Sequence, residues 1–170
     1  MTFYIVWIFY VFYRVVEMMI SRRNQRSHDY VEVGVFQRKC MVVFHILWFL
    51  AMLVEKSFIG RSSEVFSTSN IILCVLLVFA MILRYLSMRE LGSLWSTKVF
   101  KIPRDKVVKS GIYAITNNGN YLGVVFELFI VPFLFKLYLT AIVFSIINCV
   151  FLYFRIALER EILVEGTYYE

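Results

Sequence analysis

Long apolar runs, separated by shorter polar segments, set the pattern of this chain from its first residues. The runs at residues 2–20, 41–59 and 69–88 each come close to the about 20 mostly apolar residues that a membrane-spanning helix requires. Arg14 and Glu17 interrupt the first run, and no small-residue cleavage site follows it. We therefore expect three membrane-spanning helices here, the first of them retained and not removed as a signal peptide.

A longer apolar block covers residues 121–156, which is too long for one straight helix and suits two. Pro132, followed by the segment from Phe135 to Tyr138 with its charged Lys136, marks the expected corner. The pattern predicts a tight hairpin of helices at 121–135 and 138–156. The predicted fold class is an all-α integral membrane protein with about five transmembrane helices, in a single domain over residues 1–170.

Composition agrees with a membrane protein, because 61% of the 170 residues are hydrophobic, more than a soluble domain of this length covers. The net charge of +6 does not indicate nucleic acid, since the basic residues flank the apolar runs and line no polar face. Cys40, Cys74 and Cys149 lie far apart without ligand spacing, so we expect neither a metal site nor a disulfide framework.

Charge asymmetry predicts the orientation. The first polar segment, after residue 20, and the third, from Arg89 to Asn120, carry basic clusters, whereas the second is short and rich in serine. Basic loops face the cytoplasm in most membrane proteins. The first and third segments and the C-terminal tail should then share the cytoplasmic side, where a site could be assembled from them, with the N-terminus on the opposite side.

Ionisable residues inside membrane helices are costly and mark candidate functional positions. Glu127 lies about two turns into the fourth expected helix, and no nearby residue in the sequence neutralises it. Arg155 and Glu159 lie four residues apart near the end of the fifth, so they share a helix face. This second pair could act in a site or form an ordinary boundary salt bridge, and spacing alone leaves both interpretations open.

Four further ionisable residues have simpler interpretations. Arg14, Glu17 and Arg84 lie near helix ends, where snorkelling to the interface or mutual pairing would account for them. His45 in the second helix is expected to be a hydrogen-bonded packing residue.

A glycine- and asparagine-rich segment from Gly111 to Gly123 precedes the fourth helix. Such residues favour a turn whose backbone N–H groups stay available. At a helix N-terminus these groups can bind an anion such as a carboxylate, although a plain connection would also fit.

Several short motifs follow one another in a fixed order along the second half of the chain. They are a Gly-x-Tyr, an Asn-Tyr-x-Gly, an apolar stretch with a glutamate and a proline, and an arginine-to-glutamate block. The matching residues are Gly111 and Tyr113, Asn120 to Gly123, Glu127 with Pro132, Arg155-Ile156 to Glu159 with Leu163, and upstream Arg84, Leu91-Gly92 and Trp95. This pattern resembles the isoprenylcysteine carboxyl methyltransferase family, small membrane enzymes that use S-adenosylmethionine.

Within that family the chain resembles short bacterial members that methylate alkylpyrones made by type III polyketide synthases. The resemblance runs from the first helix to the last. The residues that carry it are Arg14-Val15-Val16-Glu17, Arg23-Asn24, His45 and Trp95-Ser96-Thr97-Lys98.

The resemblance implies an S-adenosylmethionine-dependent O-methyltransferase for a lipophilic acidic oxygen, either an alkylpyrone enol or a prenylcysteine-type carboxylate. It implies a multi-pass protein of the bacterial inner membrane with its site facing the cytoplasm, whose partners are that acceptor and the bilayer, without nucleic acid or metal. Arg155 and Glu159 would be catalytic, and Trp95 and Arg84 would bind substrate. The cofactor would be bound by Gly111, Tyr113, Asn118, Gly119, Asn120, Tyr121, Gly123 and Glu127.

The chain also departs from the family pattern in places. The family has Arg-His-Pro where this chain has Asn117, Asn118 and Gly119, and an arginine where it has Ala114. A Glu-Glu pair near the end is replaced by Glu159-Arg160. The alternative interpretation is therefore a catalytically degenerate relative that binds a lipid or a partner protein.

Overall fold

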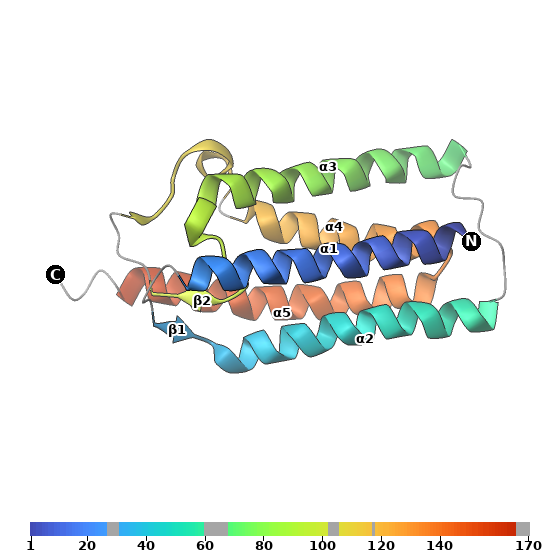
Figure 1. Cartoon of the computed structure of the whole chain (residues 1–170), viewed down its shortest axis with the longest axis horizontal. Helices are drawn as coiled ribbons and strands as arrows, with labels where there is room; N and C mark the ends of the chain where they lie inside the picture. The colour runs from blue at the N-terminus through green and yellow to red at the C-terminus, as the bar shows by residue number, and fades with distance from the viewer. Residues whose placement is uncertain (27–30, 60–67, 102–105, 117, 166–170) are drawn as a thin grey trace.

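Five helices dominate the computed structural model, which describes residues 1–26, 31–59, 68–101, 106–116 and 118–165. The expectation of an all-α membrane fold is confirmed. The helices are α1 (Thr2–Gln25), α2 (Val35–Ile59), α3 (Thr68–Leu91), α4 (Gly119–Leu134) and α5 (Tyr138–Glu165). They lie side by side along one long axis (Figure 1).

Four of the described helices are long and apolar enough to cross a membrane. Their candidate spans are Thr2–Gln25, Val35–Ile59, Asn70–Leu94 and Tyr138–Ile162. The fourth helix in sequence, α4, has 16 residues, which at about 1.5 Å per residue is shorter than the hydrocarbon core. The expected five apolar helices are present, but α4 is a shorter, largely buried member of the set.

Several helices extend beyond the apolar runs that predicted them. The second begins at Val35, before the expected residue 41, and α5 continues to Glu165, beyond the expected 156. The first continues to Gln25. A helix satisfies its backbone hydrogen bonds internally, so it can continue into polar sequence once it has left the apolar layer.

The hairpin between α4 and α5 lies where the sequence predicted it. The amide of Leu137 donates to the Pro132 carbonyl at 3.0 Å, and Lys136 adopts a left-handed conformation with φ of 61°. Glu55 of α2 then accepts hydrogen bonds from the amides of Leu139 at 3.1 Å and Thr140 at 2.8 Å. A carboxylate at a helix N-terminus satisfies free amides and complements the helix dipole, so α2 fixes the start of α5.

The first and third polar segments meet at one end of the bundle, on the left of Figure 1, where α1, α3 and α5 end. Two short strands join there, β1 (Glu32–Val33) and β2 (Val99–Phe100), antiparallel with Glu32 opposite Phe100. Glu32 also pairs with Arg38 at 2.6 Å and Lys98 at 2.8 Å. Two 3₁₀ turns, η1 (Gly92–Leu94) and η3 (Gly111–Ala114), complete the described part of this end.

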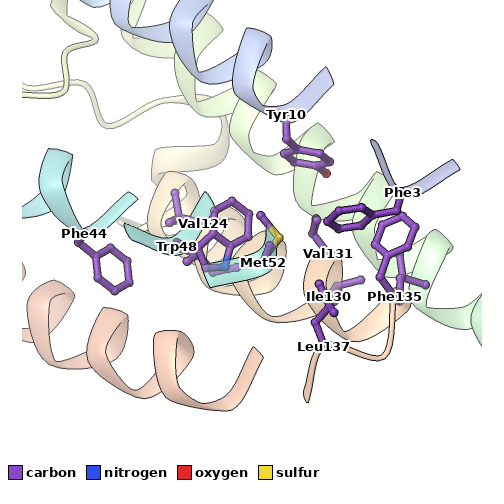
Figure 2. Packing of buried hydrophobic residues seen from close by; sticks show 12 residues of the cluster. Phe3, Tyr10, Phe44, Trp48, Met52, Val124, Ile130, Val131, Phe135 and Leu137 are labelled. Carbon is purple, nitrogen blue, oxygen red and sulfur yellow. The ribbon is translucent and has the colours of Figure 1, made fainter. Parts of the chain in front are cut away.

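The apolar core surrounds α4 (Figure 2). Phe3 and Tyr10 of α1 and Trp48 of α2 pack with residues of α4 such as Val131. Val124, Leu128, Ile130 and Val131 are all buried, whereas the other helices leave many apolar side chains exposed for lipid. An apolar helix enclosed by others is typical of a bundle interior. Because α4 occupies that interior, any polar residue that it carries is buried with it.

Candidate functional site

Arg155 is held by residues from two helices. Its Nε donates to the hydroxyl of Tyr121 at 2.8 Å and lies 3.4 Å from Oε1 of Glu159, one turn further along α5. The Tyr121 hydroxyl in turn donates to Glu159. Arg155 is only 8% exposed, and its guanidinium carbon lies 5.7 Å from the centre of the Tyr121 ring. The pair expected from spacing is therefore a triad in which α4 supplies the third member.

The two terminal nitrogens of Arg155 make no hydrogen bond to any residue that the structure describes. The side chain is thus anchored through Nε, with the outer fork of the guanidinium available. Such a fork can hold a carboxylate or another oxyanion in two places.

Tyr113 brings the turn η3 to the same site. Its hydroxyl lies close to Ser87 of α3 and interacts electrostatically with the carboxylate of Glu159. Burial raises the pKa of the Tyr113 hydroxyl, the neighbouring Ser87 acts in the opposite direction, and the negative charge of Glu159 raises the pKa further. Tyr113 is therefore a neutral donor or acceptor at neutral pH, and the site combines residues of α3, η3, α4 and α5.

Three glycines, Gly111 before α4 and Gly119 and Gly123 within it, each lie against one polar side chain of α3. A β-carbon on Gly119 would lie 2.8 Å from Oγ of Ser87, and one on Gly111 would meet the carboxylate of Glu90. A β-carbon on Gly123 would collide with the side chain of Arg84. The sequence suggested that these glycines expose backbone N–H groups, whereas the structure shows that they admit polar side chains of α3.

We expect Gly123→Ala to lower the stability of the helix bundle. Its β-carbon would lie 2.9 Å from the backbone oxygen of Ala80, which cannot move aside as a flexible side chain does. Overpacking of this kind costs about 1–3 kcal/mol. The thermal unfolding temperature in detergent should fall, whereas the control Leu122→Ala, at an exposed position on the same helix, should change it little. Equal unfolding temperatures for Gly123→Ala and wild type would show that α3 and α4 can separate at no cost.

The asparagines at the start of α4 have different surroundings. Asn118 precedes the helix, and its backbone oxygen accepts from Leu122 at 3.0 Å. The Oδ1 atom of Asn120 is buried and has no hydrogen-bond partner among the described residues. Asn117 lies outside the described residues. The expected loop before a helix is thus present, with the helix beginning at Gly119, two residues earlier than predicted.

A second polar group lies deeper in the bundle, where four charged residues form a closed ring. Arg14 contacts Glu17 and Glu127, both at 2.9 Å. Arg84 contacts the same two carboxylates, with 2.5 Å to Glu127. The four side chains are between 0% and 15% exposed. Each arginine thus meets two carboxylates and each carboxylate two arginines.

The ring supplies partners that the sequence did not reveal and corrects one interpretation. Glu127 has two cationic partners, which come from α1 and α3 and are far from it in the chain. Arg84 is 2% exposed and lies inside the bundle, so snorkelling is wrong for it, whereas the alternative of mutual pairing is confirmed, because Glu17 pairs with both Arg14 and Arg84. Both terminal nitrogens of Arg84 already donate to carboxylates.

The ring and the Arg155 triad are separate groups. Tyr121 and Glu127 are six residues apart on α4, which corresponds to about 9 Å along the helix axis. Glu127, expected to bind cofactor, and Arg84, expected to bind substrate, belong to the deeper ring. His45 lies elsewhere again, with its Nδ1 atom 2.8 Å from the Met41 carbonyl, as a packing residue would be.

Trp95, the other residue expected to bind substrate, is 3% exposed, and its indole nitrogen has no partner among the described residues. Asn24 of α1 donates to its backbone oxygen at 2.9 Å. Ser21 accepts from the amide of Thr97 at 2.9 Å. The end of α1 therefore holds the segment that carries Trp95.

Sequence reasoning missed Ser87 and Glu90. Both follow Arg84 at intervals of three residues, and that spacing places all three on one side of α3. Polar residues at helical spacing near the end of an apolar run were the signal that could have identified them.

The fold and these buried polar groups define a multi-pass helical membrane protein whose candidate site lies at the basic end of the bundle. The sequence model of the isoprenylcysteine carboxyl methyltransferase (ICMT) family matches residues 71–165, more than half of the chain. The protein belongs to this family of membrane methyltransferases, whose members generally use S-adenosylmethionine. The matched part contains Tyr113, Tyr121, Arg155 and Glu159.

A curated relative covers more of the chain. The protein is 32% identical over 157 residues to the uncharacterized protein YpbQ of Bacillus subtilis (strain 168), an alignment that spans 89% of this chain and 90% of the relative. No solved structure matches.

Proposed function

We propose that this protein is an S-adenosylmethionine-dependent O-methyltransferase that acts on a lipophilic acidic oxygen, such as an alkylpyrone enol or a prenylcysteine-type carboxylate. The observation that carries the proposal is the geometry of Arg155. Its Nε is anchored by Tyr121 and Glu159, while its terminal nitrogens make no hydrogen bond to the described residues. Family membership supports the methyl-transfer class.

The residues around Arg155 fit a positively charged cofactor with hydrogen-bond donors. S-adenosylmethionine carries a sulfonium, an ammonium group and ribose hydroxyls, so it needs acceptors and negative charge. The carboxylate of Glu159 is 31% exposed, and the Oδ1 atom of Asn120 is buried without a partner among the described residues. Tyr121, Asn120 and Glu159 would hold the cofactor beside Arg155.

The protein's part in the reaction is mainly positioning. When bound, the cofactor supplies a methyl group on a cationic sulfur. Arg155 would orient the ionised oxygen of the acceptor and offset the loss of its hydration. An acidic enol or carboxylic acid is already ionised near neutral pH, so no strong general base is needed. Alignment of the reacting atoms and exclusion of water can then supply most of the acceleration.

The proposal includes an orientation with the site facing the cytoplasm of a bacterial inner membrane. Basic residues gather at the end of the bundle that holds the site, whereas the opposite end carries only Lys56 and Lys136 among the described residues. This asymmetry supports a cytoplasmic site by the positive-inside rule. Reporters fused at the two termini should then lie on opposite sides, with the C-terminal one in the cytoplasm.

A lipid- or partner-binding relative without activity is the second candidate. Asn118 and Gly119 stand where the family pattern has His and Pro, and this departure favours it. Asn118 can hydrogen-bond as histidine does, but it cannot carry a charge.

Calorimetry with S-adenosylmethionine on detergent-purified protein separates the two candidates. We expect binding, followed by methyl transfer to a long-chain alkylpyrone or a prenylated cysteine in a radiolabel assay. Binding should strengthen in Asn118→His if the altered segment weakens the pocket. If the protein neither binds the cofactor nor methylates either acceptor, it is the inactive relative.

A further inference from the structure

Glu90 stands at the outer end of a column of polar side chains on α3. Arg84, Ser87 and Glu90 follow at intervals of three residues, each step being about 4.5 Å along the helix. Arg84 lies against Gly123, Ser87 against Gly119 and Glu90 against Gly111. The column thus begins in the buried ion ring, passes the Tyr113 contact of the Arg155 site, and ends toward water.

The carboxylate of Glu90 is positioned but unpaired. Its Oε1 would lie 2.5 Å from a β-carbon on Gly111, so the missing side chain of that glycine makes room for it. Gly111 has φ of +55°, a conformation that glycine adopts at little cost. No described residue forms an ion pair or hydrogen bond with Glu90, although it is half-buried. A carboxylate placed in this way retains its capacity to accept hydrogen bonds.

We propose that Glu90 is a cofactor-binding residue, an inference that rests on the function proposed above. Its carboxylate accepts hydrogen bonds from donor groups of S-adenosylmethionine, either the ribose hydroxyl pair or the ammonium group. Glu90 lies one step outward from Ser87, which contacts Tyr113 in the site. A cofactor with its methyl group near Arg155 and its remainder toward water would extend past this carboxylate.

The charge of Glu90 favours the cofactor over the methyl acceptor. An anionic enolate or carboxylate is repelled by a carboxylate, whereas the sulfonium and ammonium groups of the cofactor are attracted. Glu90 also lies near the end of α3, which ends at Leu91 at the same end of the bundle as the candidate site. With the site facing the cytoplasm, as proposed above, a water-soluble cofactor would arrive from that side.

The test compares cofactor binding by wild type and Glu90→Gln, which keeps the size of the side chain and removes its charge. We expect S-adenosylmethionine to bind about tenfold or more weakly to the variant, as the loss of a charged hydrogen bond implies. Glu161→Gln is the matched control, because it removes an exposed carboxylate from the same end of the bundle and changes the net charge equally. Glu90→Asp should bind with intermediate affinity.

The same titrations with 5′-methylthioadenosine, which keeps the ribose and lacks the amino-acid part, identify the donor. Weaker binding of both ligands to Glu90→Gln assigns the hydroxyls, and weaker binding of S-adenosylmethionine alone assigns its cationic groups, which 5′-methylthioadenosine lacks. If the wild type binds S-adenosylmethionine and Glu90→Gln binds it equally well, this inference is wrong and the proposed function stands. Absence of binding to the wild type would overturn the proposed function together with it.

Discussion

Replacing Arg155 with lysine should reduce methyl transfer by about 10²-fold, the range found when one oriented donor to a developing charge is removed. Arginine offers a planar fork that can hold an oxyanion in two places while Nε stays bonded to Tyr121 at 2.8 Å. Lysine has a single ammonium group, which cannot occupy the Nε position and reach the acceptor together. The unfolding temperature and the affinity for S-adenosylmethionine should change much less, because charge is conserved.

The alternative is a structural role for Arg155, which is only 8% exposed and is anchored through Nε to Tyr121. On that interpretation Arg155→Lys would lower the unfolding temperature through the lost contact and would reduce turnover no more than it reduces stability. Arg160→Lys, an exposed arginine five residues along the same helix, is the control for nonspecific effects of the substitution. A loss confined to turnover indicates a group that acts on the transition state. A fully active Arg155→Lys enzyme would assign Arg155 to structure.

The helices were predictable because the membrane imposes a length and a polarity that can be read directly from the chain. The apolar runs identified α1 to α3, and the corner at Lys136 identified the hairpin. Helix ends were less predictable, since a helix such as α5 continues into polar sequence beyond residue 156. The short pair of strands β1 and β2 could not be predicted from the sequence, because two residues are too few to show the polar–apolar alternation of a strand.

The candidate site was predictable only where its contacts are local in sequence. The spacing of Arg155 and Glu159 predicted their proximity, and that of Arg14 and Glu17 predicted theirs. The hydroxyl of Tyr121 on Arg155 joins two helices, and no periodicity within either helix reveals such a contact. For the same reason Glu127 looked unneutralised, although two arginines from other helices lie against it.

The largest change in stability should come from breaking the ion ring unevenly. Glu127→Gln keeps the shape of the side chain but leaves Arg14 and Arg84 facing Glu17 alone, a net positive charge in the bundle interior. Removing one partner of a buried ionic group costs about 3–5 kcal/mol, because the remaining charge keeps its desolvation penalty without its counter-ion. Glu17→Gln should be similarly destabilising. Glu32→Gln, which removes a partly exposed acid that also has two basic partners, should cost at most about 1 kcal/mol.

A double substitution tests whether the four residues act as one ring. Arg14→Met with Glu17→Gln removes one positive and one negative charge from α1 and leaves the pair of Arg84 and Glu127, whose contact is 2.5 Å. Because the interior is again neutral, the double variant should unfold at a higher denaturant concentration than Glu17→Gln alone, although it carries one more substitution. A double-mutant cycle over the two sites should therefore show strong coupling, since residues of one network do not contribute independently. Additive losses would mean that each residue is stabilised by its own surroundings and that the closed arrangement of charges contributes nothing.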